Sequence, residues 1–560
     1  MLRPYPALSA RILYITLFSA LLLPSANADV VRMDVLNTSL LGDQAGFGTR
    51  GAFEQVTGTV HFTVDPTDPH NAIIADLELA PRNTAGEVEF SADIVIWKPV
   101  DMARGNGVTL VDIPNRGTQP GLNFNKPAQG NALGDGFLLS EGYTVVWVGW
   151  EYDIPTEAGI GIDVPSVPGV DNSAIAGLGL AAVRDVASWI RYSDAAPFNS
   201  DYLLSFGLSQ SGRFLRNFLY LGFNEDEHGR QVFSGMMPHI AGASRIDLNR
   251  RGAEPVSQGQ YTATAFPFTD AALPDPVSGA VDGLLDNDRA RAMQPGIFYT
   301  DTGPEYWGGG RVAALTHVQP DSSADLDLQD NVRLYYLASA QHGPAAFPPD
   351  DATTGQLRPN PLDYWWHLRS LLTAMKDWVV DGTAPPPSRH PRIDDGSLVV
   401  PAAVTFPAIP GVHSLAELTA RTRAANPLLP RNGGEGAPLP LLVPQVDADG
   451  NDAAGIRHPE LAVPLATYTG WNFMHPERGN PDELVALAGS YIPFAANAEQ
   501  RRAAGDPRPS IAERYASKDD YLQLVRAAAN ALVGERYLLM RDVDLIVERA
   551  AAHWDLLTTE

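Results

Sequence analysis

Ser209 stands at the centre of a run of small residues that joins an apolar stretch to an amphipathic one. Residues 203–206 are mostly apolar, and Gly207 and Ser211 flank the serine two positions away. A nucleophile elbow forces its serine into a strained turn between strand and helix, which leaves no room for large side chains at those flanking positions. The pattern therefore predicts that Ser209 is a nucleophile. The N–H of Gln210, at the start of the helix, would then face a developing oxyanion.

This segment has two other interpretations, a simple connecting turn and an elbow centred on Ser211. A turn rich in glycine and serine can simply connect a strand to a helix, but the order of buried strand, turn and helix is what confirms an elbow. Ser211 is the rival nucleophile. An elbow centred on Ser211 would place Arg213 where a small residue is needed, so the pattern favours Ser209.

A serine nucleophile needs a base, and His342 is the best candidate among the twelve histidines. In this kind of site the residues follow the order serine, acid, histidine, so the histidine should follow the last core strand. His342 comes four residues after a strand expected over 332–338, within a tight turn. Four others fit less well: His475 as a weaker base, His239 as a residue that lines the pocket, His317 before the strand, and His367 on a helix rich in tryptophan.

The acid should follow the preceding strand, which we expect over 297–300. Asp301 and Glu305 both come after it, and either carboxylate can orient an imidazole or instead cap the turn around residues 303–304. A second oxyanion donor should come from the loop after a strand expected over 108–113. We assign it to the N–H of Arg116 or Gly117, although Gly117 can also serve only as a turn residue.

Short β-type runs alternate with helical patterns up to about residue 390, which predicts an α/β fold with a mostly parallel sheet flanked by helices. Antiparallel edge strands are expected within 52–97, and the region 244–294 has little periodicity and is interpreted as an insertion. The expected buried strands cover 108–113, 143–148, 202–206, 297–300 and 332–338, and helices are expected over 178–192 and after the elbow.

A proline cluster at 385–387 marks the best candidate boundary. It separates a core over 29–390 from a loop-rich region over 391–560. In that region, residues 517–520 form a capping-box pattern that opens a helix, and a second helix is expected over about 541–554. These two helices are expected to pack back on the core.

The N-terminus predicts export. Arg3 and Arg11 precede an apolar run over 12–23 that closes on small residues at 25–28, which is typical of a signal peptide cleaved after Ala28. The run is shorter than the about 20 residues that a bilayer span needs. The mature protein is thus expected to be periplasmic or extracellular, without a membrane anchor.

Composition narrows the partners further. The chain has no cysteine, so packing without disulfides must hold the fold. Lys and Arg number 40 against 66 Asp and Glu, and the net charge of -26 argues against nucleic acid as a partner. No zinc-type cluster is present, so no metal or other cofactor is expected. The segment 447–452 resembles half of a calcium loop, but it lacks the closing glutamate, which favours a hairpin turn.

The chain resembles a family of exported proteins with an α/β-hydrolase domain and an ill-defined substrate, distantly similar to tannases and feruloyl esterases. The resemblance rests on residues 207–213, 305–308, 333–335 with 341–343, and 467–472. It implies the α/β-hydrolase fold and favours Glu305 over Asp301 as the acid. The aromatic residues of these motifs, which are more often core residues, are candidates for the pocket wall: Tyr306, Trp307, Tyr468 and Trp471.

Three functions follow from these patterns. The first is a carboxylic ester hydrolase, in which Ser209, His342 and Glu305 cleave a small or polymer-derived ester. The second is a serine peptidase on the same scaffold. The third is an exported binding protein without turnover, which the three candidate residues in the required order argue against.

Overall fold

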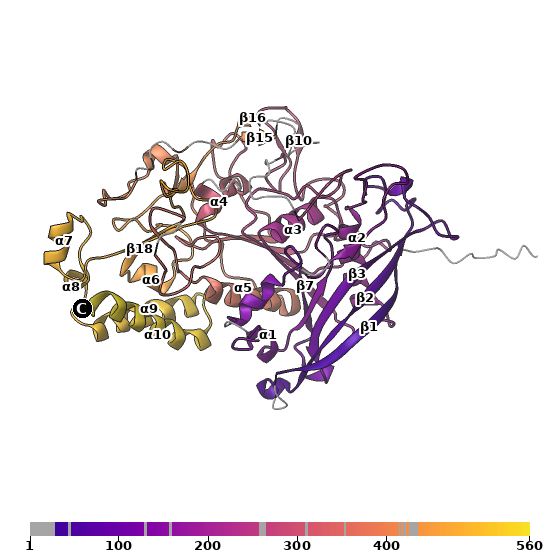
Figure 1. Ribbon diagram of the computed structural model, residues 1–560, viewed down its shortest axis with the longest axis horizontal. Helices are drawn as coiled ribbons and strands as arrows, with labels where there is room; N and C mark the ends of the chain where they lie inside the picture. Colours follow the sequence, from indigo (N-terminus) through magenta and orange to yellow (C-terminus); the bar gives the residue numbers. More distant parts are fainter. Residues whose placement is uncertain are drawn as a thin grey trace, which may run out of the picture.

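The structure is a computed structural model, and it describes residues 29–559 except 43–45, 128–130, 156–158, 257–264, 308–311, 352–353, 414, 416–417, 419–421 and 425–434. The expected signal peptide lies outside the described residues, as does part of the expected insertion. Figure 1 shows the strands of the N-terminal half at one end of an elongated molecule and the C-terminal helices at the other.

A ten-stranded sheet forms the centre of the molecule, in the order β1-β2-β3-β5-β4-β7-β8-β11-β12, with β6 paired to β3. The first three strands are antiparallel, and β5, β4, β7, β8, β11 and β12 run parallel to one another. The mostly parallel sheet expected from the sequence is thus confirmed. The strands are β1 (Asp29–Leu41), β2 (Phe53–Val64), β3 (Val88–Pro99), β4 (Val108–Asp112), β5 (Thr144–Val148), β6 (Ile162–Asp163), β7 (Tyr202–Leu208), β8 (Gly235–His239), β11 (Gly296–Asp301) and β12 (Val332–Tyr336).

Helices cover both faces of the parallel part of the sheet. On one face, Leu203 of β7 packs in a cluster with α2 (Leu178–Tyr192) and α3 (Gln210–Tyr220). On the other face, Leu204 packs with α5 (Trp365–Asp381) and α1 (Phe137–Ser140). Because successive strand residues point to opposite faces, a strand covered on both sides is mostly apolar, as the buried runs of β5 and β7 are.

The connections beyond the sheet contain short elements. Within the described part of 244–294, β9 (Leu273–Pro274) pairs with β10 (Val281–Asp282), and α4 (Gly303–Trp307) follows β11. Smaller sheets join β13 (Arg358–Pro359), β19 (Ser490–Pro493) and β18 (Ala466–Thr469), then β14 (Leu398–Val399) with β17 (Val443–Pro444), and β15 (Thr422–Ala424) with β16 (Glu435–Pro438). The later helices are α6 (Pro459–Ala462), α7 (Ala498–Ala504), α8 (Ile511–Arg514), α9 (Lys518–Gly534) and α10 (Val543–Thr558).

The C-terminal helices contact α5. Ser517 accepts the N–H of Asp520 at 3.1 Å, which caps the start of α9. The buried Arg369 of α5 pairs with Asp542, just before α10, at 2.9 Å. In addition, His367 bonds the carbonyl oxygen of Tyr537 at 2.9 Å. Apolar residues of α5, α9 and α10 belong to one buried cluster.

A second junction joins α4 to the strand end of β18. Gly303, the first residue of α4, lies so close to Gly470 that a Cβ added to Gly303 would lie 2.2 Å from the Cα of Gly470. A Cβ on Gly470 would lie 2.3 Å from the Cα of Gly303. Neither position has room for a side chain, because backbone meets backbone there.

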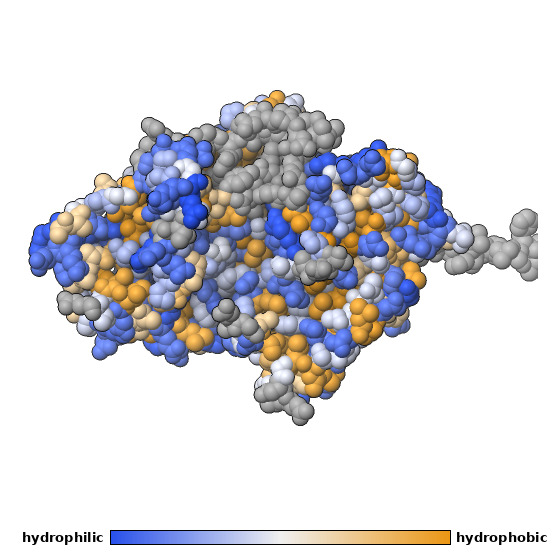
Figure 2. Space-filling model, viewed as in Figure 1, coloured by the Kyte–Doolittle hydropathy of each residue, from blue (hydrophilic) through white to orange (hydrophobic). Residues whose placement is uncertain are grey.

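The visible surface is mixed in character. Figure 2 shows hydrophilic and hydrophobic residues in small neighbouring areas over the face that it presents. Among the residues that the structure describes, no helix is both long enough and apolar enough to cross a bilayer.

Candidate active site

Ser209 occupies the sharp turn between β7 and α3. Its backbone has φ 61° and ψ -104°, a left-handed φ that a residue with a side chain adopts only at a cost. Two backbone hydrogen bonds hold it there: the Ser209 N–H donates to the carbonyl oxygen of His239 at 2.8 Å, and the Arg213 N–H donates to that of Ser209 at 2.9 Å. The turn is thus tied both to β8 and to the first turn of α3.

Small residues make this turn possible. A Cβ on Gly207 would lie 2.4 Å from the carbonyl oxygen of Ser211, and a Cβ on Gly212 would lie 2.7 Å from that of His239. Ser211 has its own role, because its Oγ accepts the N–H of Leu208 at 2.9 Å and donates to the Leu208 carbonyl oxygen at 3.1 Å. The hydroxyl of Ser211 therefore bonds the end of β7, whereas Ser209 lines a pocket.

His342 and Glu305 form a hydrogen-bonded pair, with 2.7 Å between Nδ1 and Oε1. Glu305 is fully buried on α4, and its other oxygen accepts the N–H of Thr302 at 3.1 Å and the hydroxyl of Thr302 at 2.5 Å. The backbone of His342 is also held, since the Tyr364 hydroxyl donates to its carbonyl oxygen at 2.6 Å. Together these contacts fix the orientation of the imidazole.

Asp301 takes a different position. It ends β11, and its Oδ1 accepts the N–H of Gly242 at 2.9 Å. Of the two carboxylates that the sequence left open, Glu305 contacts the ring of His342, whereas Asp301 contacts the backbone of Gly242.

The other histidines lie elsewhere. His317 bonds the Tyr306 hydroxyl at 3.0 Å inside the core, and His475 donates its backbone N–H to Thr354. His239 was expected to line the pocket, but it is fully buried beneath it and bonds the Thr300 hydroxyl at 2.8 Å. That expectation is wrong because the strand end turns the ring toward β11 rather than outward.

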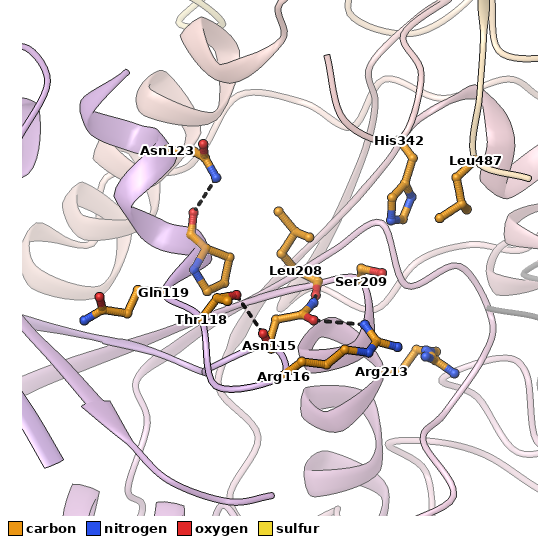
Figure 3. Close-up of a pocket in the computed structure, with 11 residues that line it drawn as sticks. Asn115, Arg116, Thr118, Gln119, Asn123, Leu208, Ser209, Arg213, His342 and Leu487 are labelled. Carbon is orange, nitrogen blue, oxygen red and sulfur yellow. Dashed lines mark hydrogen bonds between the residues drawn. The ribbon is translucent and has the colours of Figure 1, made fainter. Parts of the chain in front are cut away.

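A pocket of about 510 Å³ contains both Ser209 and His342. Figure 3 shows the His342 ring and Leu487 on one side of Ser209, and the loop after β4 on the other. Leu487 comes from the C-terminal region, and its carbonyl oxygen accepts the N–H of His342 at 3.3 Å. The described residues that line the pocket are Asn115, Arg116, Thr118, Gln119, Pro120, Asn123, Leu208, Ser209, Arg213, His342 and Leu487.

The loop after β4 is organised by a buried carboxyl group. Gly117 donates its N–H to Oε2 of Glu151 at 3.3 Å, and the backbone of Arg116 also bonds this carboxyl group. Burial, reinforced by the nearby Asp153, raises the pKa of Glu151 to about 8. The amides of Arg116 and Gly117, which we expect to act as oxyanion donors, thus both bond Glu151 in this structure.

A second buried carboxyl group, Asp112 at the end of β4, anchors the next part of this loop. Its Oδ2 accepts the N–H of Gly121 at 2.7 Å and the indole N–H of Trp147 at 2.5 Å. Burial raises the pKa of Asp112 to about 8, against the lowering effect of these two bonds. The loop that forms one wall of the pocket is thus held by hydrogen bonds to two buried carboxyl groups, Glu151 and Asp112.

The four aromatic residues that were candidates for the pocket wall belong to the core, the more common place for such residues. Tyr306, Trp307, Tyr468 and Trp471 are all buried in the apolar cluster and are absent from the described lining of the pocket. Trp307 and Trp471 lie beside the Gly303–Gly470 contact, with 6.2 Å between their ring centroids.

The acidic segment 447–452 forms a turn whose carboxylates bond other protein groups. Asp447 pairs with Arg457, Asp449 with Arg514, and Asp452 accepts the hydroxyl of Tyr336 at 2.5 Å. Within the part of the chain that the structure describes, no group of three or more histidine, cysteine or acidic side chains is placed to hold a metal ion.

A doubly covered, mostly parallel sheet with a serine at the turn after a central strand is the architecture of an α/β-hydrolase. The sequence agrees, because residues 68–548 match the family described as the alpha/beta hydrolase domain. The chain belongs to this family. No curated protein matches it.

Several solved structures are similar to this chain at low identity. A glucuronoyl esterase of carbohydrate esterase family 15 from Caldicellulosiruptor kristjansonii is 10% identical with a TM-score of 0.27, over 63% of this chain and 80% of that one. A glucuronoyl esterase from Solibacter usitatus is 12% identical with a TM-score of 0.25, over 54% and 80%. The chain spans about half of the cell-wall-degrading esterase LipA from Xanthomonas oryzae, at 14% identity, a TM-score of 0.20 and coverage of 37% and 49%.

Proposed function

We propose that this protein is a secreted serine hydrolase that cleaves carboxylic esters through Ser209, His342 and Glu305. The observation that carries the proposal is the 2.7 Å bond between His342 and the buried Glu305, beside a pocket that also contains a serine on a strained elbow. A nucleophile, a base and a group that orients the base are the parts that acyl transfer by serine needs.

In the proposed reaction, the Ser209 oxygen attacks the ester carbonyl carbon while His342 takes the serine proton. The C–O bond to the alcohol then breaks, and the alcohol leaves with that proton. Water next attacks the acyl-enzyme, His342 takes a proton from the water, and Ser209 receives it as the carboxylic acid departs. Glu305 holds the imidazole and stabilises its positive form in both halves.

The proposed oxyanion donor is the N–H of Gln210, the first residue of α3. A residue directly after the nucleophile supplies one such donor in α/β-hydrolases, and the helix N-terminus adds a favourable dipole. We assign no such role to the amides of Arg116 and Gly117, which bond Glu151. Each of these amides would have to break its hydrogen bond to Glu151 before it could donate to an oxyanion.

We also propose the organisation that the sequence predicts: a signal peptide over 1–28, a hydrolase core over 29–390 and an accessory region over 391–560. Cleavage after Ala28 would leave Asp29 at the N-terminus, which is where β1 begins. Mass spectrometry of the exported protein tests this proposal. An unprocessed N-terminus on exported protein would contradict it.

The function is tested with two serine variants. We expect Ser209→Ala to lose ester hydrolysis and labelling by a fluorophosphonate while it melts like the wild type, because the turn accepts a small residue. Ser211→Ala should keep the nucleophile and most of the activity. Loss of activity in Ser211→Ala with full activity in Ser209→Ala would show that the elbow is misplaced.

A matched ester and amide of the same acyl group separate the alternatives. Turnover of the ester supports an esterase, and turnover of the amide alone would make the protein a peptidase. If neither is cleaved over a broad panel and the fluorophosphonate does not label Ser209, the protein is a binding protein on the hydrolase fold.

A further inference from the structure

Arg213 places a buried positive charge in the pocket beside the proposed nucleophile. It follows Ser209 by four residues on the first turn of α3, its side chain is 1% exposed, and it lines the same pocket as Ser209 and His342. Figure 3 shows the two side chains in the same part of the pocket.

A neighbour on the same helix shows what a purely structural arginine does here. Arg216 is fully buried, donates to the carbonyl oxygen of Phe268 at 2.9 Å and stacks over Tyr299 at 5.0 Å. It is not one of the described residues that line the pocket. Arg213, by contrast, is one of the described residues that line the pocket.

The charge of the residues that line the pocket differs in sign from the net charge of the chain. The protein carries a net charge of -26, yet none of the eleven described lining residues is a carboxylate, and two are arginines. The second, Arg116, is exposed on the loop after β4, where it donates to the carbonyl oxygen of Val256 at 3.1 Å and to the side chain of Asn115 at 3.1 Å. The other polar lining groups, such as Thr118, Gln119 and Asn123, are uncharged.

We propose that the substrate is an ester that carries a carboxylate, and that Arg213, assisted by Arg116, binds this carboxylate while Ser209 attacks the ester. The inference rests on the proposed function. A guanidinium presents parallel N–H groups that match a carboxylate, and burial of Arg213 strengthens the attraction because little water screens it. Arg213 is thereby assigned as a residue that determines specificity.

The test uses pairs of esters that differ only in this charge. In the first pair, 4-acetoxybenzoate and its methyl ester, the carboxylate lies on the alcohol side of the ester. In the second pair, 4-nitrophenyl hydrogen adipate and methyl 4-nitrophenyl adipate, it lies on the acyl side. We expect kcat/KM of the wild type to be about 10-fold or more higher for the anionic member of at least one pair, as expected for a hydrogen bond to a charged group.

The arginine variants assign that preference to the pocket. Arg213→Leu should reduce the ratio to near one, and Arg213→Lys should keep part of it. Arg116→Gln changes an exposed residue and should reduce the ratio of kcat/KM values by a smaller factor. If Arg213→Leu does not fold, Arg116→Gln and Arg213→Lys together test the inference. Arg291→Gln removes an exposed charge outside the pocket and should leave the ratio unchanged.

The outcomes separate the inference from the proposed function. Equal turnover of both members of each pair by the wild type overturns the inference but leaves the esterase in place. A preference that persists unchanged in all three pocket variants overturns the assignment to these arginines. If no ester is cleaved, the function fails, and calorimetry on Ser209→Ala decides the inference alone. Ser209→Ala should then bind adipate at least about 10-fold more tightly than dimethyl adipate. A double variant that also contains Arg213→Lys should show a smaller difference in affinity. Equal binding of the two molecules to Ser209→Ala overturns the inference.

Discussion

In the proposed triad, Glu305 determines which nitrogen of His342 carries the proton. An ionised carboxylate only accepts hydrogen bonds, so an ionised Glu305 at 2.7 Å from Nδ1 would keep the proton on Nδ1 and leave Nε2 to act as the base. Asp301 instead accepts the N–H of Gly242 at 2.9 Å. The two carboxylates, which are four residues apart, therefore have separate tasks.

The first prediction follows from this difference. We expect Glu305→Gln to lower kcat by about 10⁴-fold, as removal of the acid does in other triads, because an amide no longer stabilises the imidazolium. Asp301→Asn keeps an acceptor for Gly242 and should lower kcat less than about 10-fold. Steady-state kinetics on one ester measure both variants. Near-normal activity of Glu305→Gln together with a crippled Asp301→Asn would reverse the assignment.

The second prediction concerns the buried Asp112, whose pKa is raised to about 8. The folded state holds this proton up to about pH 8, whereas the unfolded chain releases it near the ordinary aspartate pKa of 3.8. The contribution of Asp112 to stability is therefore greatest at low pH and decreases as the pH rises from about 4 to about 8. Asp112→Asn, which stays neutral, should remove this loss.

Thermal melts of the two proteins at pH 5 and pH 8 measure this effect. The melting temperature of the wild type should fall more between these pH values than that of Asp112→Asn, by at least about 2 °C. Asp163→Asn, at an exposed position of β6, serves as the control and should follow the wild type. Parallel curves for wild type and Asp112→Asn would show that Asp112 is ionised in the folded protein.

At the level of helices and strands, regular patterns were predicted well. The helix expected over 178–192 and the buried strands match α2, β4, β5, β7, β11 and β12 to within a few residues, because apolar runs between helical patterns are a strong signal. β1 was not predicted. Its residues Val31, Val35 and Leu36 are more than half exposed, so the strand lacks the alternation of buried and exposed positions that marks an edge strand.

The candidate site was predicted only where a local motif defines it. Ser209 and its small neighbours lie within one turn, and His342 and Glu305 each follow a strand. Leu487 approaches the pocket from a distant loop, and no local pattern predicts such a contact. Arg213 was visible in the sequence, but only as a residue too large for an elbow centred on Ser211.

The third prediction tests the packing of the elbow. Gly207→Ala would bring its Cβ to 2.4 Å from the carbonyl oxygen of Ser211, so β7 and α3 must separate. We expect the free energy of unfolding to fall by about 2 kcal/mol or more and hydrolysis to be lost. Denaturant titration and kinetics measure the two effects.

Gly343→Ala is the matched control for that variant. It lies next to His342, and a Cβ there would have no atom within 4 Å. We expect wild-type stability and most of the activity. Equal effects of the two alanines would argue against close packing as the cause.

On the scale of the whole molecule, the C-terminal region completes both the core and the pocket. Its apolar residues Val525 and Ile546 share a cluster with Leu368 of α5, and its Leu487 lines the pocket. Arg369, buried in the core, has Asp542 as a partner. Removal of this region would leave a buried charge without that partner and a broad apolar face in water.

The fourth prediction is that a chain of residues 29–390 does not fold by itself. We expect it to be insoluble or to melt without a cooperative transition, whereas the chain of residues 29–560 melts cooperatively. Calorimetry of both chains tests this expectation. A soluble 29–390 fragment with a sharp transition would show that the core and the C-terminal region are independent domains.

The contact between Gly303 and Gly470 has a consequence for how this architecture can diversify. The helix that carries Glu305 starts on one glycine, and the other glycine ends a strand of the C-terminal region. An exchange of that region for one from another hydrolase would have to keep both glycines in register, or it would displace the acid. If Glu305 and Arg116 have the proposed roles, new specificities on this scaffold would arise more readily through changes in the exposed loop around Arg116 than through recombination of whole segments.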